Sequence, residues 1–450
     1  MSGEKPSPVR HFLRSSGVMA LLYGGSVGLT FLVGVLLARL LGASGYGVYA
    51  LAMTTATLAG IATEFGLPVL AMRETGTARA SGDWSGLKGL LGWADRAIAV
   101  LSVVLALGTW AGVWIFAARG ASAYLATLLW AVALVPFVAV GKLRSFVLLA
   151  LDHTFASQFP VMILRPLLFL IGCSGLWWVS GSLAAWQAMA AQVFGAAVAM
   201  GIVVWLFRRV RPTELATARP VRDVRHWLSA CLPMGLTEGL RLLQGQLALL
   251  LTGALAGTAQ AGIYRVADAV AQITALVASV VGTAATPMFA RLWREGDRRA
   301  LQRVAAASAW AMIGGALLIG APILLLGDWL FPRLFGADFV ASVPVFAVLW
   351  CGSLATAVFG LTLAVANMTG EHMLSTRAFG LIAAVNLAAG FWAVSHYGAM
   401  GAAAASALGS FVGAAYCAAM LHRRTGINST AFNRALLPAG GGDAAKGEGA

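Results

Sequence analysis

Charged residues inside otherwise apolar segments are the residues of this sequence best placed to do chemistry. A charge at the centre of a membrane helix costs about 3 kcal/mol on insertion scales, so such charges usually have a function. Two pairs, Glu238 with Arg241 and Arg265 with Asp268, are spaced three residues apart. This spacing puts both members on one helix face, where they can pair. Each pair could line a cavity or only neutralise a helix that faces the interior of a bundle.

The basic residues among these charges could bind phosphate, because the planar guanidinium donates paired hydrogen bonds to its oxygens. Arg165 and Arg265 lie only a few residues inside predicted spans and could instead reach the lipid headgroups. The candidates for substrate binding are Arg241, Arg265, Arg165, Arg144, Lys142 and Arg96, and those for ion coupling or ion pairing are Glu64, Glu238 and Asp268. The positive charges at 96, 142 and 144 lie near predicted cytoplasmic span ends, where topology alone could explain them.

Enzyme chemistry is not supported by the remaining motifs. The six histidines are scattered without the spacing of a metal site, and the four cysteines lie alone in apolar segments, where we expect them to be small buried hydrophobic residues. Gly141-Lys142 resembles the end of a phosphate-binding loop, but Pro136 and Leu143 replace its first glycine and its Ser or Thr. We therefore predict a protein that is not an enzyme and that uses no cofactor and no metal.

The composition determines the class of protein that must position these charges. Hydrophobic residues make up 60% of the chain and charged residues 11%, there are 53 glycines, and the mean hydropathy is +0.83. A soluble domain has too little interior to bury so much apolar surface. The formal net charge of +14 comes largely from Lys and Arg in short connections between apolar segments, so it indicates membrane topology and not nucleic-acid binding.

A basic stretch at residues 208–227 divides the chain. It contains six arginines and two prolines and cannot cross a membrane, whereas about six apolar segments of roughly 20 residues lie on each side. The predicted spans are 17–41, 46–71, 90–116, 122–149, 160–180, 184–207, 228–256, 262–288, 304–326, 343–369, 378–396 and 400–421. We predict two six-helix lobes (1–207 and 228–422), a cytoplasmic linker (208–227), a disordered cytoplasmic tail (423–450) and both termini in the cytoplasm.

An internal repeat supports the division into two lobes. Gly42, Gly47 and Tyr49 match Gly257, Gly262 and Tyr264 in a G-x4-G-x-Y pattern, and the dipeptide at 82–83 matches that at 296–297. Two copies of a six-span unit enter the membrane from the same side, which predicts lobes related by an axis along the membrane normal. A cavity between such lobes can open to either side by rocking.

At these residues the sequence resembles the polysaccharide flippases of the multidrug/oligosaccharidyl-lipid/polysaccharide exporter superfamily. The similar stretches are ARLLGASGYGVYALA, FGLPVLAMRE, GTAQAGIYRVADAV, TPMFARLWREGDRRAL, LFGADFVASVPVFAVL and NLAAGFWAVSHYGAMGAAAASALGS. The resemblance implies an all-α transporter of twelve helices in the bacterial inner membrane. It would move polyprenyl-diphosphate-linked oligosaccharides for exopolysaccharide or lipopolysaccharide synthesis, with the bilayer and polysaccharide assembly proteins as its other partners.

One position departs from the family pattern. An Asp-Arg pair is expected in the seventh span, where this chain has Ala248 and Leu249, so no role of that acidic position carries over. A drug or metabolite antiporter of the same superfamily, which would need carboxylates in its cavity, is an alternative, and so is a lipid II flippase, which usually has two more spans. A membrane-embedded polymerase or ligase is the third, but it would need a long outer loop rich in arginine and histidine.

Overall fold

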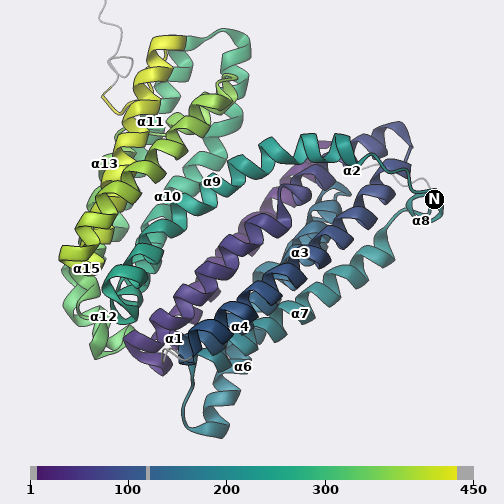
Figure 1. The fold of residues 1–450 in the computed structure, drawn as a ribbon. Coiled ribbons are helices and arrows are strands. Elements are labelled where there is room, and N and C mark those ends of the chain that lie inside the picture. The colour runs from purple at the N-terminus through teal and green to yellow at the C-terminus, as the bar shows by residue number, and fades with distance from the viewer. Residues whose placement is uncertain (1–7, 118–121, 433–450) are drawn as a thin grey trace, which may run out of the picture. The chain divides into compact units, whose positions relative to one another are not determined.

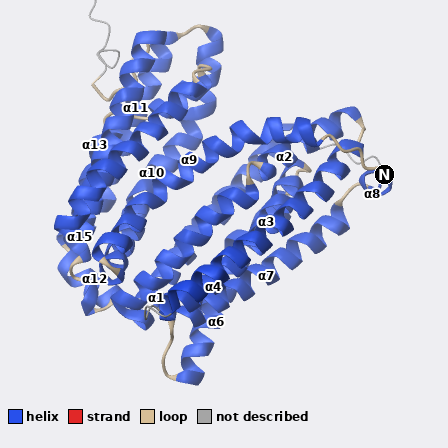
Figure 2. Ribbon diagram, in the orientation of Figure 1, coloured by secondary structure: helices blue, strands red, loops and turns tan. Residues whose placement is uncertain are grey.

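The computed structural model describes residues 8–117 and 122–432, and every regular element within them is helical (Figures 1 and 2). The elements are α1 (Pro8–Glu64), α2 (Leu67–Ser81), α3 (Ser85–Ala117), α4 (Ser122–Ala150), α5 (Thr154–Phe159), a π-helical turn (Pro160–Leu164), α6 (Arg165–Ser180), α7 (Ala185–Val210), α8 (Thr213–Thr217), α9 (Val224–Ala256), α10 (Thr258–Glu295), α11 (Arg298–Leu325), α12 (Gly327–Phe335), a 3-10 turn (Ala337–Phe339), α13 (Ser342–Ala357), α14 (Thr362–Met368) and α15 (His372–Thr425). The all-α fold class is confirmed.

The candidate membrane spans of the described chain are compatible with the predicted number once kinks are considered. Nine helices are long and apolar enough to cross a membrane, and the pair α13 and α14, bent by 42°, makes a tenth. Two of the nine, α1 and α15, are each interrupted by a non-helical glycine, Gly42 and Gly398. If each of these two helices counts as two spans, the total is compatible with the twelve predicted.

Glycines with positive φ interrupt the chain at corresponding places in the two repeats. Gly42 (φ 65°) corresponds to Gly257 (φ 88°), and Gly82 and Gly296 both have a φ of 77°. Other residues adopt this backbone region only at a cost, so glycine ends the preceding helix at these points. The repeat seen in the sequence is therefore also a repeat of backbone conformation.

The described chain divides into two compact units. The described residues within 1–253, 257–262 and 334–338 form the first unit, and those within 254–256, 263–333 and 339–450 form the second. The first therefore includes α9 up to Gly253, the segment that the sequence analysis assigns to the second lobe. The division into two six-helix lobes and a linker stays a prediction.

Helix α4 is the centre of the first unit. It packs against α1, α2, α3 and α7 (Figure 1). The buried core around it is aliphatic and includes Leu70, Leu90, Leu143 and Val147. This arrangement directs the polar side chains of α4 toward α1 on one side and toward α3 and α7 on the other.

In the second unit, α15 packs against α13 and α14, and α11 packs against α13. Asp297 caps the start of α11 by accepting a hydrogen bond of 2.8 Å from the N–H of Ala300. The segment after α15 is also ordered, because Ile427 and Ala431 are buried and the N–H of Ala431 donates to the carbonyl of Val358. The prediction of a disordered tail from 423 is thus wrong for residues 423–431, and 433–450 lie outside the described residues.

Two further expectations need correction. The fifth span runs over Thr154–Ser180 and not 160–180, because the π-helical turn continues the helix through Pro160. Arg165 therefore lies well inside this span and not near its end. Cys351 is exposed, unlike the other three cysteines, which are buried as expected.

Candidate functional site: a basic cavity in the first unit

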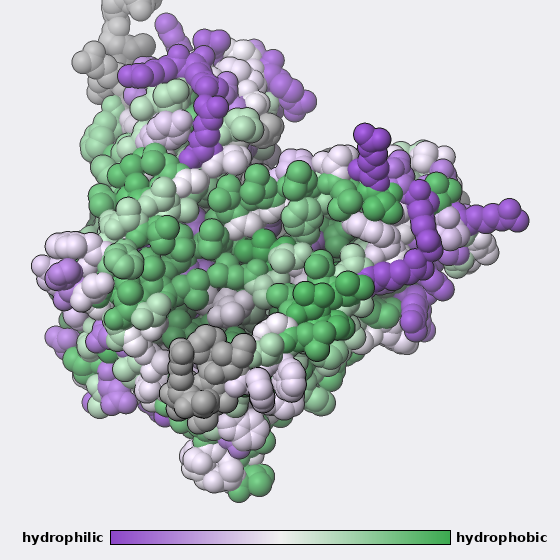
Figure 3. Space-filling view, in the orientation of Figure 1, coloured by the Kyte–Doolittle hydropathy of each residue, from purple (hydrophilic) through white to green (hydrophobic). Residues whose placement is uncertain are grey.

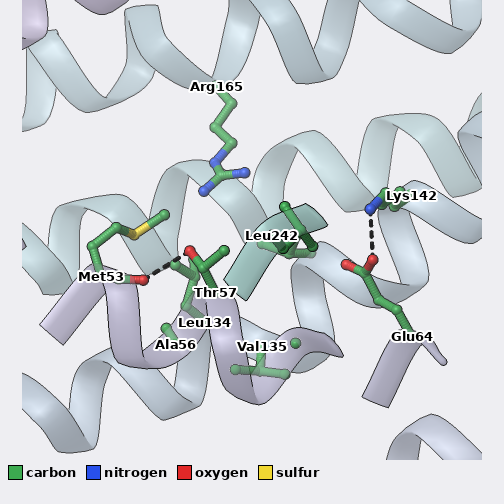
Figure 4. Close-up of a pocket in the computed structure, with 11 residues that line it drawn as sticks. Met53, Ala56, Thr57, Glu64, Leu134, Val135, Lys142, Arg165 and Leu242 are labelled. Atoms are coloured by element: carbon green, nitrogen blue, oxygen red, sulfur yellow. Dashed lines mark hydrogen bonds and ion pairs between the residues drawn. The ribbon is translucent and has the colours of Figure 1, made fainter. Parts of the chain in front are cut away.

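A cavity of about 180 Å³ lies within the first unit between α1, α4, α6 and α9 (Figure 4). Three charged side chains reach it, Glu64, Lys142 and Arg165, and the hydroxyl-bearing Thr57 also lines it. The other lining residues are Met53, Ala56, Gly60, Leu134, Val135, Val138 and Leu242. The site therefore has a few charges in a largely apolar wall, which is typical of small-molecule sites.

Glu64 and Lys142 form an ion pair at the edge of this cavity. The Lys142 Nζ lies 2.6 Å from the Glu64 Oε2, and the two side chains are 34% and 14% exposed. Glu64 is the last residue of α1, because the chain turns at Phe65 and Gly66, both with positive φ. The pair thus joins the end of α1 to the last third of α4.

Arg165 points into the same cavity without an ion-pair partner. It begins α6 directly after the π-helical turn, and its Nε is buried without a hydrogen-bond acceptor. Figure 4 shows its guanidinium directed into the cavity. Among the residues that the structure describes, no carboxylate forms a salt bridge with it. A buried cation that is not neutralised by the protein favours binding of an anion.

Two more cavities adjoin the first through shared lining residues. One of about 270 Å³ is lined by Glu238, Gly239 and Gly235 of α9 together with Glu64 and Lys142. The other, of about 80 Å³, is lined by Lys142 and Arg165. Lys142 is therefore common to all three cavities and is the residue that an entering ligand would meet in each of them.

The structure forms both pairs that the sequence spacing predicts. Arg241 binds Glu238 through two hydrogen bonds of 2.9 and 2.7 Å, and both side chains are more than a third exposed. Glu238 lines the larger cavity, whereas Arg241 lines none of the three. In the second unit the Arg265 Nη1 lies 2.9 Å from the Asp268 Oδ2, which also accepts a bond from Gln272.

The other two basic candidates lie away from the cavities of the first unit. Arg144 forms an ion pair with Asp95 of α3, and its Cζ lies 5.2 Å from the ring centroid of Phe207. Arg144 is therefore directed toward α3 and α7, two residues along α4 from Lys142. Arg96 is exposed on α3. These positions favour structural or topological roles over substrate binding.

Sequence reasoning missed Thr57 of α1, which lines the cavity, and the nearby hydrogen bond between α1 and α9. The hydroxyl of Thr57 donates to the Met53 carbonyl at 2.9 Å and lines the cavity. Thr54, one turn earlier, donates to the side chain of Gln246 at 3.0 Å. Gln246 lies two residues before Ala248, and with Gln244 it is the polar residue nearest to the departure from the family pattern in the sequence.

The fold is shared with solved membrane transporters and with a lipid flippase. The structure is similar to an inward-facing multidrug resistance MATE family transporter of the MOP superfamily, with a TM-score of 0.71, 15% identity and coverage of 86% of this chain and 92% of the other. It is also similar to the lipid II flippase MurJ in an inward closed conformation, with a TM-score of 0.69, 12% identity and coverage of 89% of this chain and 87% of the other. For a mutant of the Vibrio cholerae MATE transporter VcmN, the TM-score is 0.59, the identity 16% and the coverage 92% of this chain and 97% of the other.

The family model described as "Polysaccharide biosynthesis protein" matches residues 12–293, and the chain belongs to this family. The resemblance stated from the sequence is thereby confirmed. A comparison with curated proteins found no match. The chain is thus a multi-pass membrane protein of the polysaccharide biosynthesis family, and it shares its fold with the solved transporters and the flippase named above.

Proposed function

We propose that the protein is a flippase that moves polyprenyl-diphosphate-linked oligosaccharides across the bacterial inner membrane by alternating access. The observation that carries this proposal is the unneutralised Arg165 in a cavity that also contains Lys142. Two cations face one carboxylate there, so the cavity has an excess of positive charge. A diphosphate supplies the matching negative charge.

The lining residues suggest how the substrate is held. The diphosphate accepts hydrogen bonds from the Arg165 guanidinium, and Lys142 turns from Glu64 toward the bound anion. Glu64 and Glu238 then provide acceptors for sugar hydroxyls in the larger cavity. The polyprenyl chain stays in lipid, because its transfer into this small cavity would gain nothing over the hydrocarbon of the bilayer.

The excess of positive charge also argues against an antiporter of cationic drugs. Such a substrate needs unpaired carboxylates, whereas Glu64 is bound to Lys142 and Glu238 to Arg241. Within the described residues no group of histidines, cysteines or carboxylates could hold a metal ion. We place both termini in the cytoplasm and infer polysaccharide assembly proteins as partners at the same membrane.

The experiment that tests this function follows lipid-linked oligosaccharides in a strain that lacks the gene. We expect single repeat units to accumulate on the cytoplasmic leaflet and surface polysaccharide to disappear. Repeat units that reach the outer leaflet but stay unpolymerised would indicate a polymerase, and intact surface polysaccharide would indicate an antiporter.

Complementation then tests the cavity itself. An Arg165→Ala variant should restore much less surface polysaccharide than the native protein at equal membrane level, and Arg165→Lys should restore an intermediate amount because it keeps the charge but loses the planar fork. Arg377→Ala is the matched control, since Arg377 is exposed on α15. Equal complementation by the Arg165→Ala and control variants would exclude Arg165 from substrate binding.

A further inference from the structure

Six exposed arginines lie at the end of α7, in the connection that follows and at the start of α9. They are Arg208, Arg209, Arg211, Arg219, Arg222 and Arg225. We call residues 208–225 the basic segment. Figure 3 shows hydrophilic side chains gathered at this end of the first unit, where Figure 1 places α2 and α8. No residue that lines the three cavities belongs to the basic segment.

The basic segment is fixed to α3 and is not a loose tether. The Lys88 Nζ donates to the carbonyls of Ala216 and Ala218 at 2.6 and 2.8 Å. The N–H of Val221 donates to the carbonyl of Ser85 at 3.2 Å. A β-carbon at Gly89 would lie 1.8 Å from the carbonyl oxygen of Val221, so only glycine permits this approach.

Two hydrophobic contacts hold the segment further. Leu215 of α8 is buried in the core of the first unit. Trp227, just beyond the segment, is buried and packs on Trp93 with ring centroids 5.6 Å apart. The arginines between these anchors are therefore displayed from a backbone of defined position. This lowers the entropy lost when they bind a ligand.

Protein carboxylates do not neutralise these arginines. Within residues 8–117 and 122–432, none of the six forms a salt bridge, and the two acids of the segment are engaged locally. The Asp223 Oδ1 accepts from the N–H of His226 at 3.1 Å, and the Glu214 Oε2 accepts from the hydroxyl of Thr213 at 3.3 Å. The positive charge of the segment remains available to an external anion.

Exposed apolar side chains lie among these charges. Val221 is 55% exposed between Arg219 and Arg222, and Leu228 (47%) follows at the start of α9. Trp205, near the end of α7, is also exposed, and the Arg209 Cζ lies 5.3 Å from its ring centroid. Arginines mixed with exposed aliphatic and tryptophan side chains are typical of a membrane-surface segment.

We propose that the basic segment binds the headgroups of anionic phospholipids on the leaflet that it faces. The phosphates accept hydrogen bonds from the guanidinium forks, and Val221 enters the boundary of the acyl chains. Membrane topology explains why arginines are found between spans, but it requires neither the Lys88 anchor nor an exposed valine between them. Lipid binding accounts for the charge, the fixed backbone and the exposed apolar side chains together.

Native mass spectrometry of the purified full chain with dioleoyl phosphatidylglycerol or dioleoyl phosphatidylcholine tests the proposal. We expect phosphatidylglycerol to bind at least tenfold more tightly. The variant R219Q/R222Q/R225Q should bind phosphatidylglycerol about a hundredfold more weakly. Each basic residue near an anionic lipid surface strengthens binding about fivefold, and the variant lacks three of them. Equal binding of the two lipids by the native protein would overturn the proposal.

Three controls separate a defined site from general charge attraction. The variant R294Q/R299Q/R303Q removes the same charge from exposed arginines of α10 and α11 and should change binding less than threefold. Lys88→Met keeps all six arginines but removes the anchor and should weaken binding about tenfold, whereas Lys88→Arg keeps a donor and should not. Equal losses in the two triple variants, full affinity of the Lys88→Met variant, or displacement of the lipid by inorganic phosphate would refute the site.

Discussion

Replacement of Lys142 by methionine tests whether the Glu64–Lys142 pair is only structural or also serves transport. The change leaves the Glu64 carboxylate, 14% exposed, without its cation. Breaking a fully buried pair costs about 3–5 kcal/mol. Lys142 is 34% exposed, so water screens part of the interaction, and we expect about 2 kcal/mol of destabilisation.

The double variant Glu64→Gln/Lys142→Met separates the effect of the pair on stability from its effect on transport. It removes the unpaired charge together with its partner, so most of the lost stability should return. Transport should not return, because Arg165 is then the only charged residue among those that line the cavity. Thermal unfolding of the detergent-solubilised variants measures the first effect as a fall of a few degrees in the single variant, and surface polysaccharide at equal membrane level measures the second.

Each outcome of the measurements on these two variants assigns a role to the Glu64–Lys142 pair. If the double variant regains stability and transport together, the pair is structural and Lys142 does not bind substrate. If Lys142→Met leaves the unfolding midpoint unchanged, the Glu64 carboxylate is hydrated without its partner, and the expected destabilisation is refuted. Recovery of stability without recovery of transport is the result that the cavity geometry leads us to expect.

Three further predictions concern other parts of the fold. Arg241→Ala should lower transport without loss of membrane insertion, because it removes the ion-pair partner of Glu238, which lines the larger cavity, and Arg241→Lys, which keeps the charge, should lower transport less; unchanged transport in a complementation assay would show that this pair does not affect the site. Gly47→Val should lower the unfolding midpoint, since a β-carbon there would lie 1.7 Å from the Thr258 carbonyl oxygen, whereas Gly76→Ala, with open space, should not. Hydrogen bonds from the Ser85 hydroxyl and N–H lower the pKa of Asp83, so its contribution to stability is present above the unfolded-state pKa and is lost as pH falls through the folded-state pKa; Asp83→Asn should abolish this part of the pH profile of thermal unfolding.

The class and the repeat of the fold could be predicted from the sequence because both depend on local properties. Apolar segments of about 20 residues indicate spans, and the glycines at 42 and 257 mark the same backbone break in both repeats. The two ion pairs spaced three residues apart were predictable for the same reason. In both cases neighbours in the sequence decide the geometry.

The cavity could not be predicted, because it depends on contacts between distant segments. Glu64 and Lys142 are 78 residues apart, and nothing in the sequence distinguishes their pairing from that of Lys142 with Asp95. The neighbouring Arg144 takes Asp95 because α4 directs positions 142 and 144 to different helices. The rotation of α4 about its axis therefore decides that Lys142 lines the cavity and that Arg144 packs against α3 and α7.

The depth of Arg165 also depended on a feature that periodicity does not reveal. The sequence places Pro160 at the start of a span, where proline is usual, but a π-helical turn continues the helix through it from Thr154. A π-turn inserts one residue and rotates everything that follows. Arg165 is the first residue after this turn. The continuation of the helix from Thr154 explains the position of Arg165 well inside the span, and the π-turn changes the direction in which its side chain leaves the helix.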